Sequence, residues 1–178
     1  MRLSNDDFKN LIRNGILLSI DLIIRRDDGK ILLGKRINMP AKGYWFVPGG
    51  RVLKNENFKD ALHRICTSEV GNLKEGYYFR KLGMYNHIYK DNFFGDPDFN
   101  THYIAIGIEL FESDIEMKNS MTEQHDEVLY LSENEIMHNH QVHDNTKYYF
   151  IENPPNKFLF SSGVKSRYLI IVVSIRKA

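Results

Sequence analysis

The sequence has a single cysteine, Cys66, among 178 residues, which excludes an intrachain disulfide and favours a reducing compartment. It also lacks a surplus of either charge: the formal net charge is +1, so the composition gives no reason to expect binding to nucleic acid. The N-terminus has no signal-peptide pattern, and every apolar run is too short to span a bilayer. We therefore expect a soluble, cytoplasmic protein that does not associate with membranes.

The length is that of one domain with its own apolar core. Strands are expected at residues 15–25, 30–36, 44–48, 75–90, 101–111 and 128–131, and helices at residues 5–13, about 55–71, from 132, and about 144–152. Asn55 and Asp144 are the expected N-caps of two helices, and Ser132 opens a capping box. Because the elements do not repeat as strand–helix–strand units, we predict an α+β domain with an antiparallel or mixed sheet.

The helix expected after Asn55 carries an acid on its apolar side. At about 100° per residue, Phe58, Leu62 and Ile65 form one stripe, and Glu69 continues it. One interpretation is that the stripe ends and Glu69 leans into solvent in the last turn. The other is that Glu69 is buried as a metal ligand or in an ion pair, because a bare carboxylate on a packed face is costly.

The segment before this helix favours the second interpretation. Pro48-Gly49-Gly50 is expected to form a turn at which the backbone can approach a ligand closely, and Arg51 follows it. Mg²⁺ takes one or two protein oxygens together with phosphate oxygens, and arginine offers a fork that suits phosphate. A carboxylate, a backbone carbonyl and an arginine together are the groups that a magnesium–diphosphate complex would need.

Residues 50–72 resemble the Nudix box, G-x5-E-x7-R-E-U-x-E-E-x-G-U, in which U is a bulky apolar residue. Five fixed positions of the box are matched at the expected spacing, by Gly50, Glu56, Arg64, Glu69 and Gly71.

Three positions depart from the box. Ile65 and Ser68 stand where the box has glutamates, and Asn72 replaces its last bulky residue. Because the ordinary box gathers several carboxylates to hold several metal ions, the retention of Glu69 alone predicts one metal ion.

The degenerate box, with LLGKR, PAKGYWFVPGGRV, DNF, THY and EQHDE, is similar to GDP-mannose mannosyl hydrolases, an unusual Nudix branch, over residues 3–153. The resemblance implies a Nudix fold, a mixed β-sheet sandwiched between helices, in a homodimer. It also implies hydrolysis of GDP-mannose to GDP and mannose, with water attacking the anomeric carbon and inverting it. One Mg²⁺ per subunit is implied, with Mn²⁺ as a substitute.

The resemblance assigns roles to individual residues. Glu69 would bind Mg²⁺ with the Gly49 carbonyl and the side-chain oxygen of Gln124. Glu56 would be structural, and the role of Arg64 stays open between a structural contact and support of the metal ligand.

Three residues are implied in catalysis. His125 would be the general base for water, oriented by one of the next two acids, although most loop histidines are merely solvated. Asp21, which shares a strand face with Ser19, would stabilise an oxocarbenium-like transition state, unless it is an acid satisfied by backbone donors. Arg36 would neutralise the departing diphosphate, unless it is an ordinary surface arginine.

Five residues are implied in substrate binding. Arg51 and Tyr103 would contact phosphate, His87 and Tyr89 would shape the sugar or phosphate pocket, and Phe8 would contact guanine, in its own subunit or across a dimer interface.

Several alternatives remain at this stage. The chain divides into a Nudix domain, residues 1–156, and an extension, residues 157–178, which could be an edge strand, a cover for a dimer surface or disordered. Mannose, glucose and a deoxysugar are not distinguished as the glycosyl group. The competing functions are an ordinary Nudix diphosphatase that cleaves a P–O bond of a nucleotide sugar, and a catalytically inactive nucleotide-sugar-binding protein.

Overall fold

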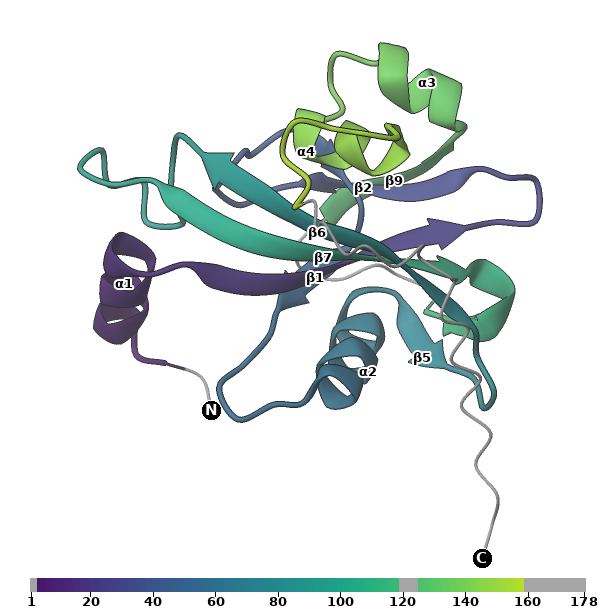
Figure 1. The fold of residues 1–178 in the computed structure, drawn as a ribbon, viewed down its shortest axis with the longest axis horizontal. Helices are drawn as coiled ribbons and strands as arrows, with labels where there is room; N and C mark the ends of the chain where they lie inside the picture. The colour runs from purple at the N-terminus through teal and green to yellow at the C-terminus, as the bar shows by residue number, and fades with distance from the viewer. Residues whose placement is uncertain (1–2, 119–124, 159–178) are drawn as a thin grey trace, which may run out of the picture.

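The computed structural model describes residues 3–118 and 125–158. In this part of the chain a seven-stranded mixed sheet carries helices on both faces (Figure 1), which confirms the predicted α+β class with a mixed sheet. The helices are α1 (Asn5–Asn14), α2 (Phe58–Glu69), α3 (Glu133–His138) and α4 (Asp144–Lys147), with 3-10 turns η1 (Glu112–Asp114) and η2 (Tyr148–Phe150). The strands are β1 (Leu17–Arg25), β2 (Ile31–Arg36), β3 (Trp45–Phe46), β4 (Gly49–Arg51), β5 (Gly71–Leu73), β6 (Phe79–Tyr89), β7 (Thr101–Phe111), β8 (Ile115–Met117) and β9 (His125–Leu131).

The sheet has the order β3-β2-β1-β7-β6, with β9 added to β2 and β4 added to β1. Strand β1 pairs with β7 in parallel along the whole length of β1, and the other pairs are antiparallel. On its second edge β1 meets β2 only at Arg25, while β4 pairs with residues 19–21. The half of β1 that contains Asp21 is therefore bordered by β4.

The two faces of β1 contact different layers. Ile20, Leu22 and Ile24 pack into a core with α2. Ile23 belongs to a second core that includes Tyr149 of η2. Because side chains alternate along a strand, Ser19 and Asp21 share the face of Ile23, which Figure 1 shows covered by α3 and α4, with α2 on the opposite side.

Helix boundaries differ from the prediction at two N-caps. Asn57, not Asn55, caps α2, since its side chain accepts from the Asp60 N–H at 3.0 Å, while Asn55 adopts a left-handed φ of 65° before the helix. His143, not Asp144, caps the last helix, which gives way to η2 after Lys147. The capping box at Ser132 is confirmed: the Ser132 side chain accepts from the backbone N–H of Glu135, and the Glu135 side chain accepts from the backbone N–H of Ser132.

Two segments expected to be irregular are strands. The Gly49-Gly50 pair forms β4 instead of a turn, and glycine suits it because a Cβ on Gly50 would lie 3.2 Å from Ile65 of α2. His125, expected in a loop, is the first residue of β9. The separate pair of β5 and β8 was not expected.

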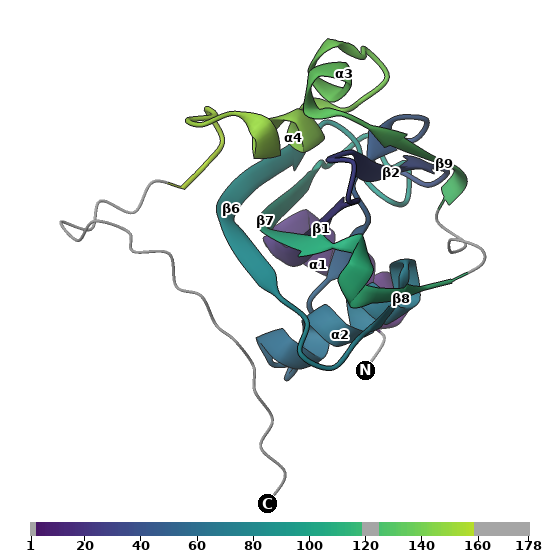
Figure 2. The same cartoon turned by 90° about the vertical axis from the view of Figure 1, so that its right-hand side faces the viewer.

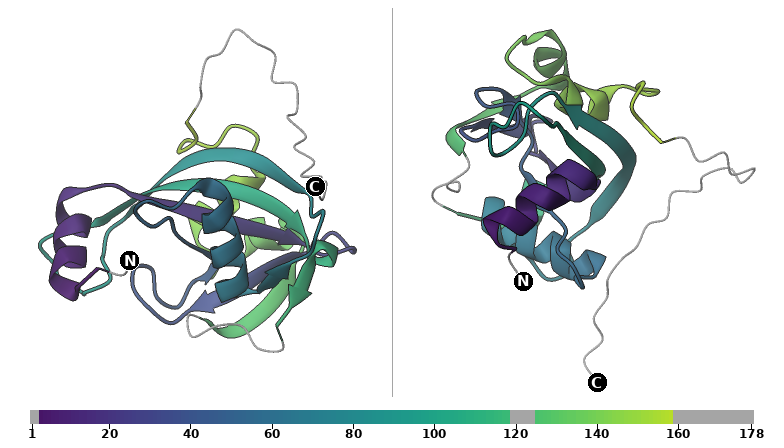
Figure 3. Two further views of the ribbon diagram at one scale, coloured as in Figure 1. Left: turned by 90° about the horizontal axis from the view of Figure 1, so that it is seen from below. Right: turned by 90° about the vertical axis from the view of Figure 1, so that its left-hand side faces the viewer.

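The two ends of the described chain lie against different parts of the sheet. Helix α1 sits at one end of the sheet, away from α2 (Figure 3). Residues 156–158 run along β6, where the Asn86 N–H donates to the Asn156 carbonyl at 2.8 Å and the Phe158 N–H to the Met84 carbonyl at 2.9 Å. No helix of the described residues is long and apolar enough to cross a membrane.

Candidate active site

Glu69 is buried at the end of α2, with only 3% of its surface exposed. The interpretation in which it leans into solvent is therefore wrong. The neighbouring Ser68 hydroxyl lies 3.5 Å from its Oε1 atom. A buried carboxylate is stable only with compensating charge or hydrogen bonds, which is the environment that a metal ligand also needs.

Two carbonyls of β4 point away from β1. The flanking residues Pro48 and Val52 hydrogen-bond to β1 at 2.7 and 2.9 Å. Because hydrogen-bonded residues alternate along an antiparallel strand, the carbonyls of Gly49 and Arg51 point away from β1. Arg64 of α2 reaches this side of β4, since its Nη2 donates to the Arg51 carbonyl at 2.7 Å. The Gly49 carbonyl thus lies on the side of β4 that α2 approaches.

Glu56 and Arg64 form an ion pair that fixes the loop before α2. The Arg64 guanidinium donates to the two carboxylate oxygens at 2.6 and 2.8 Å, and the pKa of Glu56 is lowered by this contact. Glu56 also accepts from the Leu53 N–H at 2.9 Å. Arg64 therefore ties β4, the loop and α2 together, which favours the structural alternative for its role.

The described residues around Glu69 offer oxygen donors, which suit a hard cation. No group of three or more His, Cys, Asp or Glu side chains that could hold a metal occurs among them. A carboxylate and a backbone carbonyl are oxygen donors, and Mg²⁺ characteristically takes few protein ligands and completes its shell with water and phosphate. Gln124, the third expected ligand, lies outside the described residues.

Asp21 lies on the other face of β1, in a cluster of buried polar side chains. The Tyr149 hydroxyl donates to its Oδ2 atom at 2.8 Å, and the Ser19 hydroxyl donates to Oδ1 at 3.3 Å. Burial raises the pKa of Asp21 to about 6, although both hydrogen bonds and the charge of Arg36 oppose the increase. These donors are side chains, so the alternative of an acid satisfied by backbone groups receives no support from the described contacts.

His87 of β6 completes this cluster. Its Nδ1 atom lies 3.8 Å from Asp21 Oδ2, and its Nε2 atom lies 3.5 Å from the Tyr149 hydroxyl. Burial lowers the pKa of His87 to about 3, so its imidazole is neutral near pH 7. The sequence reading missed Tyr149, because it stands in an aromatic run 128 residues after Asp21, where nothing local distinguishes it from a core residue.

Arginines gather beside this cluster. The Arg36 guanidinium lies 5.0 Å from the centre of the Phe46 ring, and that of Arg51 lies 3.8 Å from the Phe8 ring. Burial raises the pKa of Tyr103, and the charges of both arginines oppose the increase. Burial also lowers the pKa of Arg51, which means that its cation has lost water contacts that a phosphate could replace.

The structure brings most of the expected residues together. The charges of Arg36 and Asp21 both act on Tyr89. The rings of His87 and Tyr103 each lie edge to face against the Tyr89 ring. Phe8 joins them through Arg51.

His125 is placed by its backbone alone, directly opposite Arg36 in the pairing of β9 with β2. The side chains of His125 and Asp126 lie outside the described part of the structure. Glu127, the other acid expected to orient the histidine, forms an ion pair with Lys35 at 3.0 Å.

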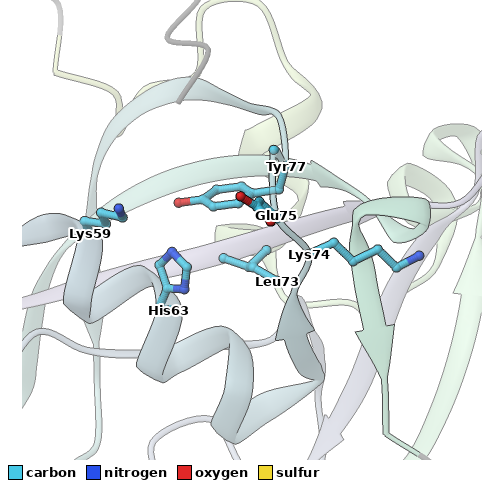
Figure 4. Close-up of a pocket in the computed structure, with 7 residues that line it drawn as sticks. Lys59, His63, Leu73, Lys74, Glu75 and Tyr77 are labelled. Carbon is cyan, nitrogen blue, oxygen red and sulfur yellow. The ribbon is translucent and has the colours of Figure 1, made fainter. Parts of the chain in front are cut away.

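A separate hollow lies on another part of α2. Figure 4 shows His63 and Lys59 of α2 facing Tyr77, with Lys74 alongside. The His63 and Tyr77 rings meet edge to face, 5.3 Å apart. None of the described candidate residues lines this hollow, so it is distinct from the candidate site.

The mixed sheet lies between helices, and an ion pair joins Glu56 in the loop before α2 to Arg64 within the helix. With a buried Glu69 at the end of the same helix, these features define a Nudix-type domain. The comparison with protein families agrees: the model of the NUDIX domain matches residues 16–153, and the chain belongs to this family. It is a family of hydrolases that use divalent metal ions and act on nucleotides and their derivatives.

One curated relative is the low-salt glycan biosynthesis protein Agl8 of Haloferax volcanii. It is 37% identical over 127 residues, which cover 71% of this chain and 78% of Agl8. Among solved structures, a MutT protein from Methanosarcina mazei Go1 covers 76% of this chain and 90% of its own, with a TM-score of 0.59 and 21% identity. A MutT NUDIX hydrolase from Burkholderia pseudomallei covers 76% of this chain and 96% of its own, with a TM-score of 0.59 and 22% identity. At these identities the two structures establish the fold alone.

Proposed function

We propose that the protein hydrolyses a GDP-sugar, with GDP-mannose as the first substrate to test, to GDP and free sugar. Water attacks the anomeric carbon and inverts it, and GDP departs with the help of one Mg²⁺. The observation that carries the proposal is the hydrogen-bonded cluster of Asp21 and Tyr149, with the buried His87 beside it and the charge of Arg36 nearby. A carboxylate at this position is the group that would stabilise an oxocarbenium-like anomeric carbon. The name of Agl8, which refers to glycan biosynthesis, is consistent with a sugar-containing substrate.

The diphosphate would lie between the arginines and Glu69. Glu69, the Gly49 carbonyl and Gln124 would hold Mg²⁺, which when bound would neutralise the charge that grows on the departing diphosphate. Arg36 and Arg51 would donate to phosphate oxygens, and Tyr103, whose hydroxyl stays protonated, would donate a further hydrogen bond. Mn²⁺ is the expected substitute, because it also prefers oxygen ligands in octahedral geometry.

The glycosyl group would lie against Asp21. An inverting hydrolase needs stabilisation of an oxocarbenium-like carbon and a base on the face opposite the leaving group. The Asp21 carboxylate, held by Tyr149 and Ser19, supplies the first. We assign the base to His125, whose backbone lies beside that of Arg36. GDP leaves as a stable anion, so the reaction needs no acid to protonate it.

The remaining assignments complete the proposal. His87 and Tyr89 form the wall of the sugar pocket, and Phe8, in contact with Arg51, lies where the guanine would begin. Residues 1–156 form the hydrolase domain, residues 157–178 are an extension, and the active form is a homodimer.

Hydrolysis in ¹⁸O-labelled water tests the site of attack. We expect the label in mannose, with the opposite anomer formed first as followed by NMR. Label in a phosphate product would instead identify a diphosphatase that cleaves a P–O bond. Binding of GDP-mannose without turnover, with Mg²⁺ or Mn²⁺ present, would identify a nucleotide-sugar-binding protein.

A further inference from the structure

The apolar side of the sheet that packs on α2 extends beyond that helix. Leu18 shares its face of β1 with the fully buried Ile20, yet 39% of its surface is exposed. Its partner on β7, Ile104, is only half-buried. Ile88 of β6 lies diagonally across from Ile104, with 61% of its surface exposed. Contiguous exposed apolar side chains are a mark of binding surfaces, and we call Leu18, Ile88 and Ile104 the open patch.

The opposite face of the same strands is covered. Tyr85, His87 and Tyr89 of β6 point to that face, and none of them is more than 7% exposed. Figure 2 shows β6 at one edge of the curved sheet, with α4 above it and α2 below. The helices α1 and α2 lie far apart along the sheet (Figure 3). The open patch is therefore exposed because the α2 side lacks, near α1, the cover that the α4 side has.

The described chain ends beside the open patch and on the same side of the sheet. Lys157 is bridged to Tyr85 on the outer edge of β6, and its ammonium lies 5.6 Å from the centre of the Tyr85 ring. Tyr85 packs with Tyr149, so Lys157 lies on the α4 side. Because side chains alternate along an extended chain, Phe158 projects on the α2 side, next to Met84, whose carbonyl accepts from the Phe158 N–H at 2.9 Å.

The residues that follow Phe158 include an apolar segment that needs a cover. Residues 159–178 lie outside the described part of the chain, and within them YLIIVVSI, residues 168–175, contains no charged residue. A bare β-prone segment of this kind is an aggregation hazard. Continued pairing with β6 does not cover it, because the antiparallel register of Lys157 with Tyr85 reaches the start of the strand, Phe79, before residue 168.

The open patch is within reach of this segment. Neighbouring strands are about 4.8 Å apart, so Leu18 on β1 lies about 10 Å across the sheet from β6. Along β6, Ile88 lies four residues beyond Met84, which is about 13 Å. The residues between Phe158 and residue 168 span up to about 30 Å when extended. The chain can therefore bring residues 168–175 onto the open patch without strain.

We propose that residues 168–175 dock on the open patch of their own chain and close the α2 side of the sheet. The C-terminal extension is then a structural part of the domain, and the apolar side chains of the open patch and of the segment are removed from water together. The open patch lies on the face opposite His87 and Tyr89, so the inference goes beyond the proposed hydrolysis and does not depend on it.

Hydrogen exchange of the full-length protein, followed by mass spectrometry, tests the docking. Ile88→Asp places a charge within the open patch. We expect the amides of residues 168–175 to exchange at least about tenfold more slowly in the wild-type protein than in this variant. Val128→Asp, at an exposed position of β9, is the matched control and should keep the wild-type rates. The amides of β1 report whether each variant is folded.

Disulfide trapping identifies what covers the open patch. Cys66 is buried, so cysteines introduced by Ile88→Cys and, in turn, Ile170→Cys or Ile171→Cys form the accessible pair. We expect a cross-link within one monomer for at least one of the two combinations, because neighbouring side chains of an extended segment point to opposite sides. Val128→Cys in place of Ile88→Cys should give no cross-link.

The possible results separate the occupants. A cross-linked dimer at low protein concentration would show that another copy covers the open patch. Fast exchange of residues 168–175 in the wild-type protein, or slow exchange that persists in Ile88→Asp, would show that this segment does not bind there. Each of these results would overturn the inference and leave the proposed hydrolysis standing. A cross-linked monomer, together with faster exchange in Ile88→Asp but not in Val128→Asp, would support it.

Discussion

The side of β1 that contacts α2 and the side that faces α4 and η2 differ in how their polar groups are supported. On the α2 side, Ile20, Leu22 and Ile24 pack in an apolar core, and the carboxylate at its edge, Glu69, comes from the helix. On the α4 side, Asp21 projects from the strand itself and meets a tyrosine hydroxyl from η2. Polar chemistry on the first side is built from one continuous segment, β4 to α2, whereas on the second it is built from distant ones.

The short strand β4 borders both sides of β1, so it could contribute to both halves of the proposed site. Side-chain alternation sends Ile20 and Asp21 to opposite faces, while β4 borders both of them. A Cβ on Gly49 would lie 2.9 Å from Asp21 Oδ1, so β4 runs directly against the polar side as well. A diphosphate placed along β4 would have the proposed metal ligands on one side and the proposed sugar pocket on the other.

The largest effect is expected from Glu69→Gln, which breaks the α2 side alone. The amide keeps the shape of the side chain but removes its charge, so the proposed Mg²⁺ ligand is lost. We expect kcat for GDP-mannose to fall by about 10²- to 10³-fold. GDP affinity in the presence of a chelator should stay the same. Wild-type turnover in this variant would contradict the assignment of Glu69 as a metal ligand.

The next effect is expected on stability, from Arg64→Met. It leaves the Glu56 carboxylate, whose side chain is 12% exposed, without its bidentate partner, and it frees the Arg51 carbonyl. We expect the free energy of unfolding, measured with urea, to fall by about 2 kcal/mol. As a control, Arg26→Met breaks the exposed pair with Asp28 and should cause no measurable change. Unchanged stability of Arg64→Met would show that this pair does not hold β4 on α2.

The difference between the two sides of β1 also explains which site residues could be predicted from the sequence. Glu56, Arg64 and Glu69 lie on one segment at fixed spacing, so the pattern located them, and Asp21 was conspicuous as an acid within an apolar strand. Tyr149 gave no such signal, because its partner Asp21 lies on β1, far away in the sequence. Contacts of this kind depend on how the strands are ordered, which local periodicity does not determine.

The misplaced elements have similar causes. Gly49 and Gly50 were predicted to turn because glycine is common in turns, yet they form a strand whose partner, β1, lies about 30 residues earlier. The chain offers asparagine at 55 and 57, and either suits an N-cap by residue type. In the structure Asn57 caps α2, which packs on β1, while Asn55 takes a left-handed φ of 65° before the helix, so residue type alone predicted the helix but not its first residue.

Tyr149→Phe is expected to affect the α4 side more mildly, by about tenfold in kcat/KM at pH 7. The hydrogen bond from Tyr149 lowers the pKa of Asp21, so its loss should raise that pKa above about 6. Because the carboxylate form is the one proposed to act, the acid limb of the pH–rate profile should move to higher pH. Tyr148→Phe, one residue earlier, is the control and should leave the profile in place. An unmoved acid limb in Tyr149→Phe would separate this tyrosine from the chemistry of Asp21.

The smallest effect is expected from His143→Asn, measured as the pH dependence of stability. Burial, with help from the charge of Arg36, lowers the pKa of His143 to about 4, while Asp144 and Asp91 oppose this decrease. Between pH 6.5 and 4 the unfolded chain therefore binds a proton that the folded protein does not, so stability is lost as the pH falls. Asparagine can still cap α4 but does not titrate. The loss of unfolding free energy from pH 7 to 4 should be smaller in the variant by about 1 kcal/mol, after allowance for partial exposure. His140→Asn, at an exposed position nearby, should leave the wild-type loss unchanged. An equal loss in wild type and His143→Asn would mean that this histidine takes up its proton in the folded state.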